Sequence, residues 1–268
     1  MRETAYAKIN LALHVRRRRE DGYHEIETLF AFVDAGDELT VEVAARDELR
    51  VTGEFAVALA DPFGNLVAKA LGKLPRPEGW RVTLDKRLPV AAGLGGGSAD
   101  AGAVFRLYDR RFGLPEDWRQ RAASLGADVP ACVDSRMCFG RGTGSEITAG
   151  PTDLAGTPVL LVNPRMPLAT ADVFARWDGV NRGSLPVGSA HEIALAGRND
   201  LEPPALELCP LIGQVLGALR ETDAWLVRMS GSGATCFALF DDAAARDAAA
   251  VRITAVRSEW WLMSGSLG

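Results

Sequence analysis

A glycine-rich stretch in the first half of the chain has the composition of a phosphate-binding loop. It holds four glycines in five positions and is followed by apolar residues at helical spacing from 101 to 108. Residues without a Cβ atom let backbone N–H groups come close to a ligand, and a helix start carries about half a positive charge. The stretch therefore predicts an anion cradle at a helix start, with a ligand-free glycine turn as the alternative. The residues of this candidate cradle are Pro89, Val90, Ala91, Ala92, Gly93, Leu94, Gly95, Gly96, Gly97, Ser98 and Ala99.

The cradle matches neither of two common nucleotide-binding patterns. A Walker loop needs a lysine directly after its last glycine, whereas Ser98 follows Gly97 here. A dinucleotide-binding fold opens with a strand that leads into the glycines, whereas Lys86-Arg87-Leu88-Pro89 precedes them here. The sequence therefore predicts another kind of phosphate binder, to which the cations Lys86 and Arg87 add long-range attraction for a polyphosphate.

A lysine and an amide share one face of a predicted strand near the start of the chain. Residues 4–15 alternate, which puts Lys8 and Asn10 on the same side of an otherwise apolar segment. A cation held on a rigid element beside an amide is suited to an anionic group. The alternative is a lysine whose ammonium reaches solvent at the edge of a sheet.

Asp128 is the candidate carboxylate. It lies in Gly126-Ala127-Asp128-Val129-Pro130, among small and apolar neighbours, where a charge needs a partner. The alternative is a cap or turn residue at a corner fixed by the proline. Tyr23 and His24 follow a turn and combine a flat ring with a directional hydrogen-bonding group, so they are either pocket residues or ordinary turn residues.

Hydrophobic periodicity predicts the elements that must position these residues. The apolar segment 26–32 is expected to end near Gly36, and a strand over 39–43 to pair with 49–52. Asn65 is expected to cap a helix over 65–74. A helix that starts within 199–204 is expected to continue through 206–219. Further helices are predicted over 101–108, 116–125 and 243–251, a hairpin over 136–147, and strands over 80–84, 159–162 and 260–263, with a second glycine loop at 230–235 running into a strand.

The totals describe an ordinary folded enzyme. The 268 residues allow one large domain or two modest ones, and Gly150-Pro151 and Gly156-Thr157-Pro158 mark the best boundary. The net charge of −5 argues against a nucleic-acid binder, and the run 16–19 of four arginines is read as a solvated loop, with an RNA contact as the alternative. No run approaches the ~20 apolar residues that span a bilayer, and no apolar signal core begins the chain. The four cysteines and three histidines lack metal-ligand spacing, so no metal site is expected, and reduced thiols in a cytoplasmic enzyme are the default.

Three separated motifs resemble the signatures of the GHMP small-molecule kinases. They are Ala7 to Leu11, Pro89 to Ala101 and Ser230 to Thr235, and they occur in the family's order. The resemblance covers nearly the whole chain. The resemblance implies a GHMP kinase fold of two-layer α/β (α+β) type, with a left-handed βαβ unit around the cradle. It implies an N-terminal ATP-binding domain of ribosomal-protein-S5-like type over 1–150 and a C-terminal ferredoxin-like domain over 151–268.

The family also implies an activity. Two motifs resemble those of the family members that phosphorylate the 2-hydroxyl of a methylerythritol linked to cytidine diphosphate. They are Asp21-Gly22-Tyr23-His24 and the motif around Asp128. That reaction belongs to the methylerythritol phosphate route to isoprenoids and uses ATP and Mg²⁺. Another GHMP kinase, acting on a sugar or a mevalonate derivative, and a catalytically silent relative that binds ligand as a regulator are the alternatives. The expected partners are the small-molecule acceptor and ATP, in a monomer or weak homodimer without nucleic acid or membrane.

Site roles follow from the resemblance residue by residue. Asp128 matches the catalytic aspartate and Lys8 the lysine beside it. The matches on the substrate side are Asn10, Tyr23, His24, Thr170 and Phe174, with the histidine reading the cytosine edge. The matches on the ATP side are Asn65, Lys86 and the cradle from Pro89 to Ala99. Ala99 stands where the family commonly has a second serine, so this chain lacks one hydroxyl that could contact phosphate. Ala91-Ala92 replace a small glycine-rich run, so the backbone before Gly93 is expected to be stiffer.

Phosphoryl transfer needs alignment and charge stabilisation rather than covalent work by the protein. The hypothesis is that Asp128 accepts the proton of the acceptor alcohol while Lys8 holds the aspartate ionised. Backbone N–H groups from Gly93 to Ser98 bind the β- and γ-phosphates of ATP, and Mg²⁺ bridges those phosphates.

Overall fold

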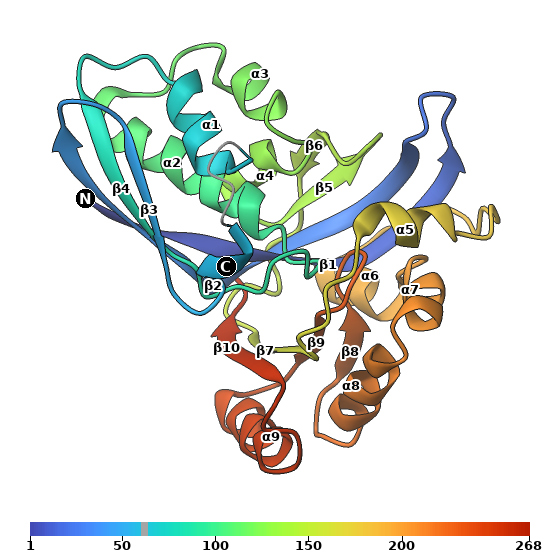
Figure 1. The fold of residues 1–268 in the computed structure, drawn as a ribbon. Helices are drawn as coiled ribbons and strands as arrows, with labels where there is room; N and C mark the ends of the chain where they lie inside the picture. The colour runs from blue at the N-terminus through green and yellow to red at the C-terminus, as the bar shows by residue number, and fades with distance from the viewer. Residues whose placement is uncertain (60–63) are drawn as a thin grey trace. The chain divides into compact units, whose positions relative to one another are not determined.

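The computed structural model describes residues 1–59 and 64–268, which separate into two compact units (Figure 1). Unit 1 comprises Met1–Lys8, Ala35–Val90 and Gly95–Ser135. Unit 2 comprises Ile9–Asp34, Ala91–Leu94 and Arg136–Gly268. The long strands β1 (Arg2–Arg18) and β2 (His24–Ala44) contribute residues to both units. The predicted single boundary near residue 150 stays a prediction.

Unit 1 is a sheet covered by helices. Its strands run in the order β3-β4-β2, where β4 (Gly79–Asp85) pairs antiparallel with the second half of β2 and β3 (Glu48–Thr52) pairs in parallel with β4. The β4 side chains Trp80, Val82 and Leu84 alternate and are fully buried, so this strand is central. The helices are α1 (Leu66–Lys73), α2 (Gly96–Phe112), α3 (Trp118–Ala123) and α4 (Val129–Asp134), with the short 3₁₀ turn Ala56–Leu59.

Helix α2 is the centre of unit 1 and contacts both α1 and α4. Gly102 permits the closest approach, because a Cβ atom there would lie 2.4 Å from the carbonyl oxygen of Cys132 in α4. Any larger residue would separate the two helices. The cradle at the N-terminus of α2 is therefore attached to the most tightly packed helix of this unit.

Unit 2 has two groups of paired strands. The first half of β2 pairs with β5 (Cys138–Arg141), which pairs with β6 (Glu146–Ala149) as the predicted hairpin over 136–147. A second, antiparallel sheet has the order β10-β7-β9-β8, in which the two inner strands β7 and β9 are almost entirely buried. Its strands are β7 (Pro158–Asn163), β8 (Leu226–Met229), β9 (Cys236–Leu239) and β10 (Trp261–Ser266).

One face of this second sheet is covered by helices that bring the core of unit 2 together. Helices α8 and α9 contact β7 and each other, as Figure 1 shows in orange and red. The core includes Ile212 and Leu216 of α8, Ile253 of α9 and Phe240 after β9. The helices of unit 2 are α5 (Thr170–Ala175), α6 (Ala190–Ala196), α7 (Glu202–Leu208), α8 (Leu211–Arg220) and α9 (Ala243–Val256).

Several predicted elements differ from the structure in extent or pairing. The arginine run 16–19, predicted as a solvated loop, continues strand β1 as far as Arg18. Segments 26–32 and 39–43 form one strand, β2. Gly36 does not form a turn but lets β2 come close to β1, since a Cβ atom there would lie 1.9 Å from the carbonyl oxygen of Ala5. The segment 49–52 pairs with β4 rather than with 39–43. The helix predicted through 206–219 is broken into α7 and α8 at Pro210, which has no backbone N–H to continue α7.

Among residues 1–59 and 64–268, no helix has the length and apolar character that crossing a membrane requires. All four cysteines are buried and none forms a disulfide.

Candidate active site

Unit 1 brings Lys8 and Asp128 together. The Lys8 Nζ atom lies 3.4 Å from Asp128 Oδ2. Lys8 is only 5 % exposed, which excludes the alternative of an ammonium that reaches solvent. Asp128 precedes the first residue of α4, yet its side chain makes no capping hydrogen bond. Its carboxylate, 31 % exposed, therefore faces the ammonium and keeps access to solvent and to a ligand.

The start of α2 lies directly against this pair. Gly95 immediately precedes the helix with a left-handed backbone, φ 62°, and a Cβ atom there would lie 3.1 Å from Lys8 Cε and 3.9 Å from Asp128 Oδ2. The first N–H groups of a helix have no partner within it, and no acidic side chain occupies the first turn of α2. Helix α2 begins within the glycines, at Gly96, rather than after them as the periodicity from 101 predicts. Ser98 thus lies in the first turn with the unpaired donors, which is the arrangement that binds phosphate.

Substitution of Gly95 by alanine should lower both stability and turnover. Alanine in the left-handed region costs about 1–2 kcal/mol, and the new methyl group would press on Lys8. Gly113 offers a matched control, because it also has a positive φ of 75° but a Cβ atom added there would meet nothing within 4 Å. Urea denaturation should show destabilisation in both variants, and steady-state kinetics should show reduced turnover in Gly95→Ala alone. Equal turnover in the two variants would mean that Gly95 has only a backbone role.

Lys86 is held beneath the cradle by two carboxylates. Its Nζ atom lies 2.5 Å from Asp37 Oδ2 and 2.7 Å from Asp100 Oδ2. Asp37 Oδ1 also accepts the backbone N–H groups of Arg87 and Leu88, and a Cβ atom on Gly96 would lie 3.1 Å from Lys86 Nζ. The lysine, 2 % exposed, therefore joins the approach to the cradle, the cradle itself and α2.

The pKa shifts in this cluster favour a charged Lys86. Burial raises the pKa of Asp100 to about 7, against the opposing effect of Lys86. Burial alone would lower the pKa of Lys86, but Asp100 and Asp37 outweigh it and the pKa of the ammonium is raised. Lys86 therefore stays charged, because the attraction of its two carboxylates outweighs the effect of burial. The predicted role of Lys86 in binding ATP stays a prediction, and these contacts favour an indirect one.

Asn65 caps α1, as the sequence predicts, and keeps one donor unused. Its Oδ1 accepts the N–H of Val67 at 2.9 Å. Its Nδ2 is buried and has no hydrogen-bond partner in the described part of the chain. Leu66, the first residue of α1, would lie 3.4 Å from a Cβ atom on Gly97, so this orphan donor belongs to the neighbourhood of the cradle. A buried amide without a partner fits an acceptor atom of a nucleotide.

In unit 2, the second glycine loop supports the entry to the cradle. Ser230 Oγ donates to the carbonyl oxygen of Gly93 at 2.8 Å, and Thr235 N–H donates to that of Ala92 at 3.2 Å. A Cβ atom on Gly93 would lie 2.2 Å from the Ser230 carbonyl oxygen. The serine-glycine motif at 230–235 therefore holds the backbone of residues 91–94 in place, in a segment where Ala91 has a φ of 54° that glycine would adopt more readily.

The same loop reaches two of the predicted substrate residues. The Asn10 N–H donates to Ser230 Oγ at 3.3 Å, and its side-chain Nδ2 donates to Thr28 Oγ1 at 2.7 Å. Thr170 Oγ1 lies 2.9 Å from Ser232 Oγ. Asn10 follows Lys8 by two residues in β1, so the two side chains leave the strand on the same face.

His24 and Phe174 form an aromatic cluster in unit 2 with a third ring that the sequence analysis missed. The His24 ring is 4.9 Å from Phe174 and 5.7 Å, edge-on, from Trp177. Trp177 Nε1 is buried without a hydrogen-bond partner among the described residues. Tyr23, 66 % exposed, is not part of this cluster. Its predicted substrate contact stays a prediction.

Signals for the missed residues were present but weak. Trp177 follows Phe174 by three residues, which is helical spacing, but α5 ends at Ala175 and the segment has no glycine or charge motif. Asp37 and Asp100 are single carboxylates 63 residues apart, and only the fold shows that both face one lysine.

Comparisons with known proteins agree on one family. Residues 62–136 match the family described as the GHMP kinases N terminal domain, and residues 187–257 match the family described as GHMP kinases C terminal. A curated protein of Novosphingobium aromaticivorans, 4-diphosphocytidyl-2-C-methyl-D-erythritol kinase, is 69 % identical over 100 % of this chain and 93 % of its own length. A kinase of the same name from Erythrobacter litoralis is 60 % identical over 99 % of this chain and 98 % of its own length.

Solved structures give the same answer. A crystal structure of a 4-(cytidine 5'-diphospho)-2C-methyl-D-erythritol kinase matches 100 % of this chain and 99 % of its own with a TM-score of 0.85 and 34 % identity. The mevalonate kinase of L. major matches 99 % of this chain and 96 % of its own with a TM-score of 0.66, but at 15 % identity it supports the fold alone.

Proposed function

Since this chain belongs to the GHMP kinase family, among its 4-diphosphocytidyl-2-C-methyl-D-erythritol kinases, we propose that it transfers the γ-phosphoryl group of ATP to the 2-hydroxyl of that cytidine-linked alcohol. The chain is thus a phosphotransferase whose product carries a 2-phosphate, in the methylerythritol phosphate route to isoprenoids. The observation that carries the proposal is the Lys8–Asp128 pair, which lies against the glycine start of α2.

Asp128 is the general base in this proposal. As the acceptor oxygen bonds to phosphorus its proton must leave, and a partly exposed carboxylate at Lys8 is positioned to receive it. The Lys8 ammonium, 3.4 Å from Asp128 Oδ2, offsets the negative charge that gathers on the reacting oxygens. The bond from phosphorus to the β-phosphate oxygen breaks, and ADP leaves.

The start of α2 holds the triphosphate of ATP. The glycines at 95–97 let the helix start pack closely against Lys8, Lys86 and Leu66. The first N–H groups of α2, which no helical carbonyl accepts, bind the phosphate oxygens. The unused Asn65 Nδ2 donor fits the nucleotide beside it. The Asp37–Lys86–Asp100 cluster keeps this backbone fixed, which limits the reorganisation needed at the moment of transfer.

Mg²⁺ fits this site as a metal held mainly by phosphate oxygens and water. The described residues contain no group of three or more histidine, cysteine or carboxylate side chains arranged for a metal ion. Asp128 is the exposed carboxylate of the site and the side chain best placed to accept a hydrogen bond from a metal-bound water. The metal supplies neutralisation of the phosphate charge when bound.

The aromatic cluster of His24, Phe174 and Trp177 receives the cytosine. Flat rings stack on a base, and His24 and the unused Trp177 N–H supply hydrogen-bonding atoms for its edge. Burial, and next the charge of Arg18, lower the pKa of His24, so the imidazole is neutral at neutral pH.

Acidification should weaken acceptor binding through His24. When the pH falls through the lowered pKa of His24, which lies below the ordinary value of 6.5, the ring gains a proton. The KM for the cytidine-linked alcohol should then rise while the KM for ATP is unchanged. The unfolded chain takes up this proton at a higher pH than the folded one, so the free energy of unfolding also falls below pH 6.5. Kinetics from pH 5 to 8 with His24→Gln, and with exposed His191→Gln as control, check this. An unchanged pH profile of KM in His24→Gln would remove His24 from the cytosine site.

The alternative is a related kinase that acts on a sugar or on a mevalonate derivative. Incubation with ATP, Mg²⁺ and a panel of acceptor alcohols, followed by mass spectrometry, separates the two. The proposal requires transfer to the cytidine-linked alcohol and little transfer to its cytidine-free analogue. Equal transfer to both would favour the alternative, and transfer to none would make the chain a silent relative.

We further expect the protein in the cytoplasm, where ATP is supplied and where its four buried cysteines, none of them in a disulfide, stay reduced. The expected partners are ATP and the acceptor, without nucleic acid, in a monomer or a weak homodimer.

A further inference from the structure

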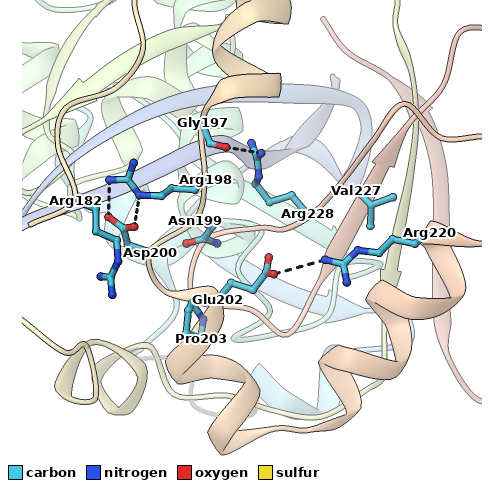
Figure 2. Close-up of a pocket in the computed structure, with 10 residues that line it drawn as sticks. All are labelled: Arg182, Gly197, Arg198, Asn199, Asp200, Glu202, Pro203, Arg220, Val227 and Arg228. Carbon is cyan, nitrogen blue, oxygen red and sulfur yellow. Dashed lines mark hydrogen bonds and ion pairs between the residues drawn. The ribbon is translucent and has the colours of Figure 1, made fainter. Parts of the chain in front are cut away.

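A pocket in unit 2 has no role in the proposed phosphoryl transfer. Its volume is about 340 Å³, which is at the small end of the range for small-molecule sites. The loop that leads into α7, the last turn of α8 and the strand β8 contribute to it (Figure 2). None of the residues predicted to bind ATP or the acceptor lines it.

The lining carries an excess of positive charge. It includes four arginines, Arg182, Arg198, Arg220 and Arg228, and two carboxylates, Asp200 and Glu202. Two positive charges are therefore in excess among the lining residues. Arg182 forms its ion pair with Asp178, which does not line the pocket, so one of these two charges is balanced from outside the lining.

Arg228 is the least compensated of these cations. It is 9 % exposed, and its guanidinium donates to the backbone carbonyl oxygens of Leu11 and Gly197. In the described part of the chain it forms no ion pair, and Glu202 acts on it only at a distance. Burial lowers the pKa of Arg228 to about 10, so the group is still charged at neutral pH. A buried cation bonded only to neutral carbonyls gains from an anion beside it.

The two carboxylates of the lining are already committed to the backbone. Asp200 Oδ2 accepts the N–H of Val15 at 2.8 Å, while Arg198 bonds its Oδ1 at 2.6 Å. Glu202 Oε2 accepts the N–H of Met229 at 3.3 Å, and its Oε1 lies 3.9 Å from Arg220. Figure 2 shows Asp200 beside Arg198 and Glu202 pointing toward Arg220. The long Glu202–Arg220 distance leaves the Arg220 guanidinium able to bond a ligand.

We propose that this pocket binds a small phosphate-bearing anion, of the size of inorganic diphosphate, through Arg220 and Arg182 at its rim and the charge of Arg228 at its base. Guanidinium groups present paired N–H donors that match phosphate oxygens, and a ligand with two or more negative charges neutralises the excess. The pocket is separate from the nucleotide cradle in its residues, so it would bind such an anion in addition to ATP.

Isothermal titration of the full chain with sodium diphosphate, in the presence of saturating ADP, tests this. The variant is Arg182→Gln/Arg220→Gln, whose two side chains are exposed and outside the core. The matched control is Arg252→Gln, because Arg252 is an exposed arginine that pairs with Glu221 in the same way and does not line the pocket. Sodium chloride at equal ionic strength serves as the second probe.

The wild type and Arg252→Gln should bind diphosphate saturably, and the double variant should bind at least about tenfold more weakly, as expected for the loss of charged hydrogen bonds. The kinase activity of the double variant should be unchanged without diphosphate, which separates this result from any failure of the proposed function. Absence of saturable binding with ADP present, equal affinity of the double variant, or an equal response to chloride would overturn the proposal.

Discussion

Asp128→Asn should reduce turnover by about 10²–10⁴-fold, the usual contribution of a general base. The amide has the size and shape of the carboxylate but cannot take the acceptor proton. It also no longer attracts the Lys8 ammonium, which lies 3.4 Å away. The binding of ATP should change little, because the proposed phosphate contacts come from the backbone at the start of α2. The effect should therefore appear in kcat rather than in the KM for ATP.

The measurement is a coupled ADP-release assay together with direct titration of nucleotide binding. Asp134→Asn is the matched control, because Asp134 ends the same helix α4, is exposed, and pairs with Arg119. Full turnover in Asp128→Asn would mean that the acceptor alcohol loses its proton to another group. An equal loss in both variants would point to damage to α4 instead.

Lys86→Met should destabilise the protein by about 3–5 kcal/mol, the usual result of removing one member of a buried charge cluster. Asp37 and Asp100 would remain as two buried carboxylates without their shared cation, and Asp100 Oδ1 already has no hydrogen-bond partner among the described residues. The loss concerns the backbone under the cradle, so the KM for ATP should rise as well.

Urea denaturation of Lys86→Met checks the stability, and exposed Lys69→Met is the control for the same chemical change. The double variant Lys86→Met/Asp100→Leu removes one of the two abandoned charges and should recover part of the lost stability. If Lys86→Met were as stable as the wild type and only its KM for ATP rose, Lys86 would contact the nucleotide directly. The indirect role favoured by its contacts would then be wrong.

The residue types of the candidate site are more visible in the sequence than their arrangement. Lys8, the cradle and Asp128 are recognisable from local composition and from the family motifs. Their proximity is not, because 120 positions separate Lys8 from Asp128 and no spacing rule relates them. The family resemblance implies that proximity. In the fold, α2 packs against α4 at Gly102, and the start of α2 at Gly95 lies near both Lys8 and Asp128.

The errors in the fold have local causes. Gly36 is a residue type typical of turns, but here the absence of a Cβ atom lets the strand pack closely against β1, so β2 continues through it. Pro203 and Pro204 lie in the first turn of α7, as the sequence predicts, because a first turn does not need their missing N–H groups. Pro210 lacks the same N–H group where a continuous helix would need it, so the helix predicted through 206–219 breaks there. The pairing of β3 with β4 depends on tertiary contacts, and the alternation of polar and apolar residues within each strand does not specify it.

Buried polar clusters are the part of the site least visible in the sequence. The residue type of Lys86 suggested a phosphate contact, while its burial between Asp37 and Asp100 depends on three distant segments. Trp177 was missed because a tryptophan three residues after a phenylalanine is ordinary core composition. Only its position against His24 and its unused N–H set it apart.

A crystal structure with a non-hydrolysable ATP analogue, Mg²⁺ and the cytidine-linked alcohol would show whether Asp128 and the start of α2 carry out the transfer. We expect the γ-phosphate against the N–H groups of residues 95–98 and the acceptor 2-hydroxyl within about 2.6–3.2 Å of the Asp128 carboxylate. Phosphates bound away from the start of α2, or a 2-hydroxyl beyond hydrogen-bonding reach of Asp128, would contradict it.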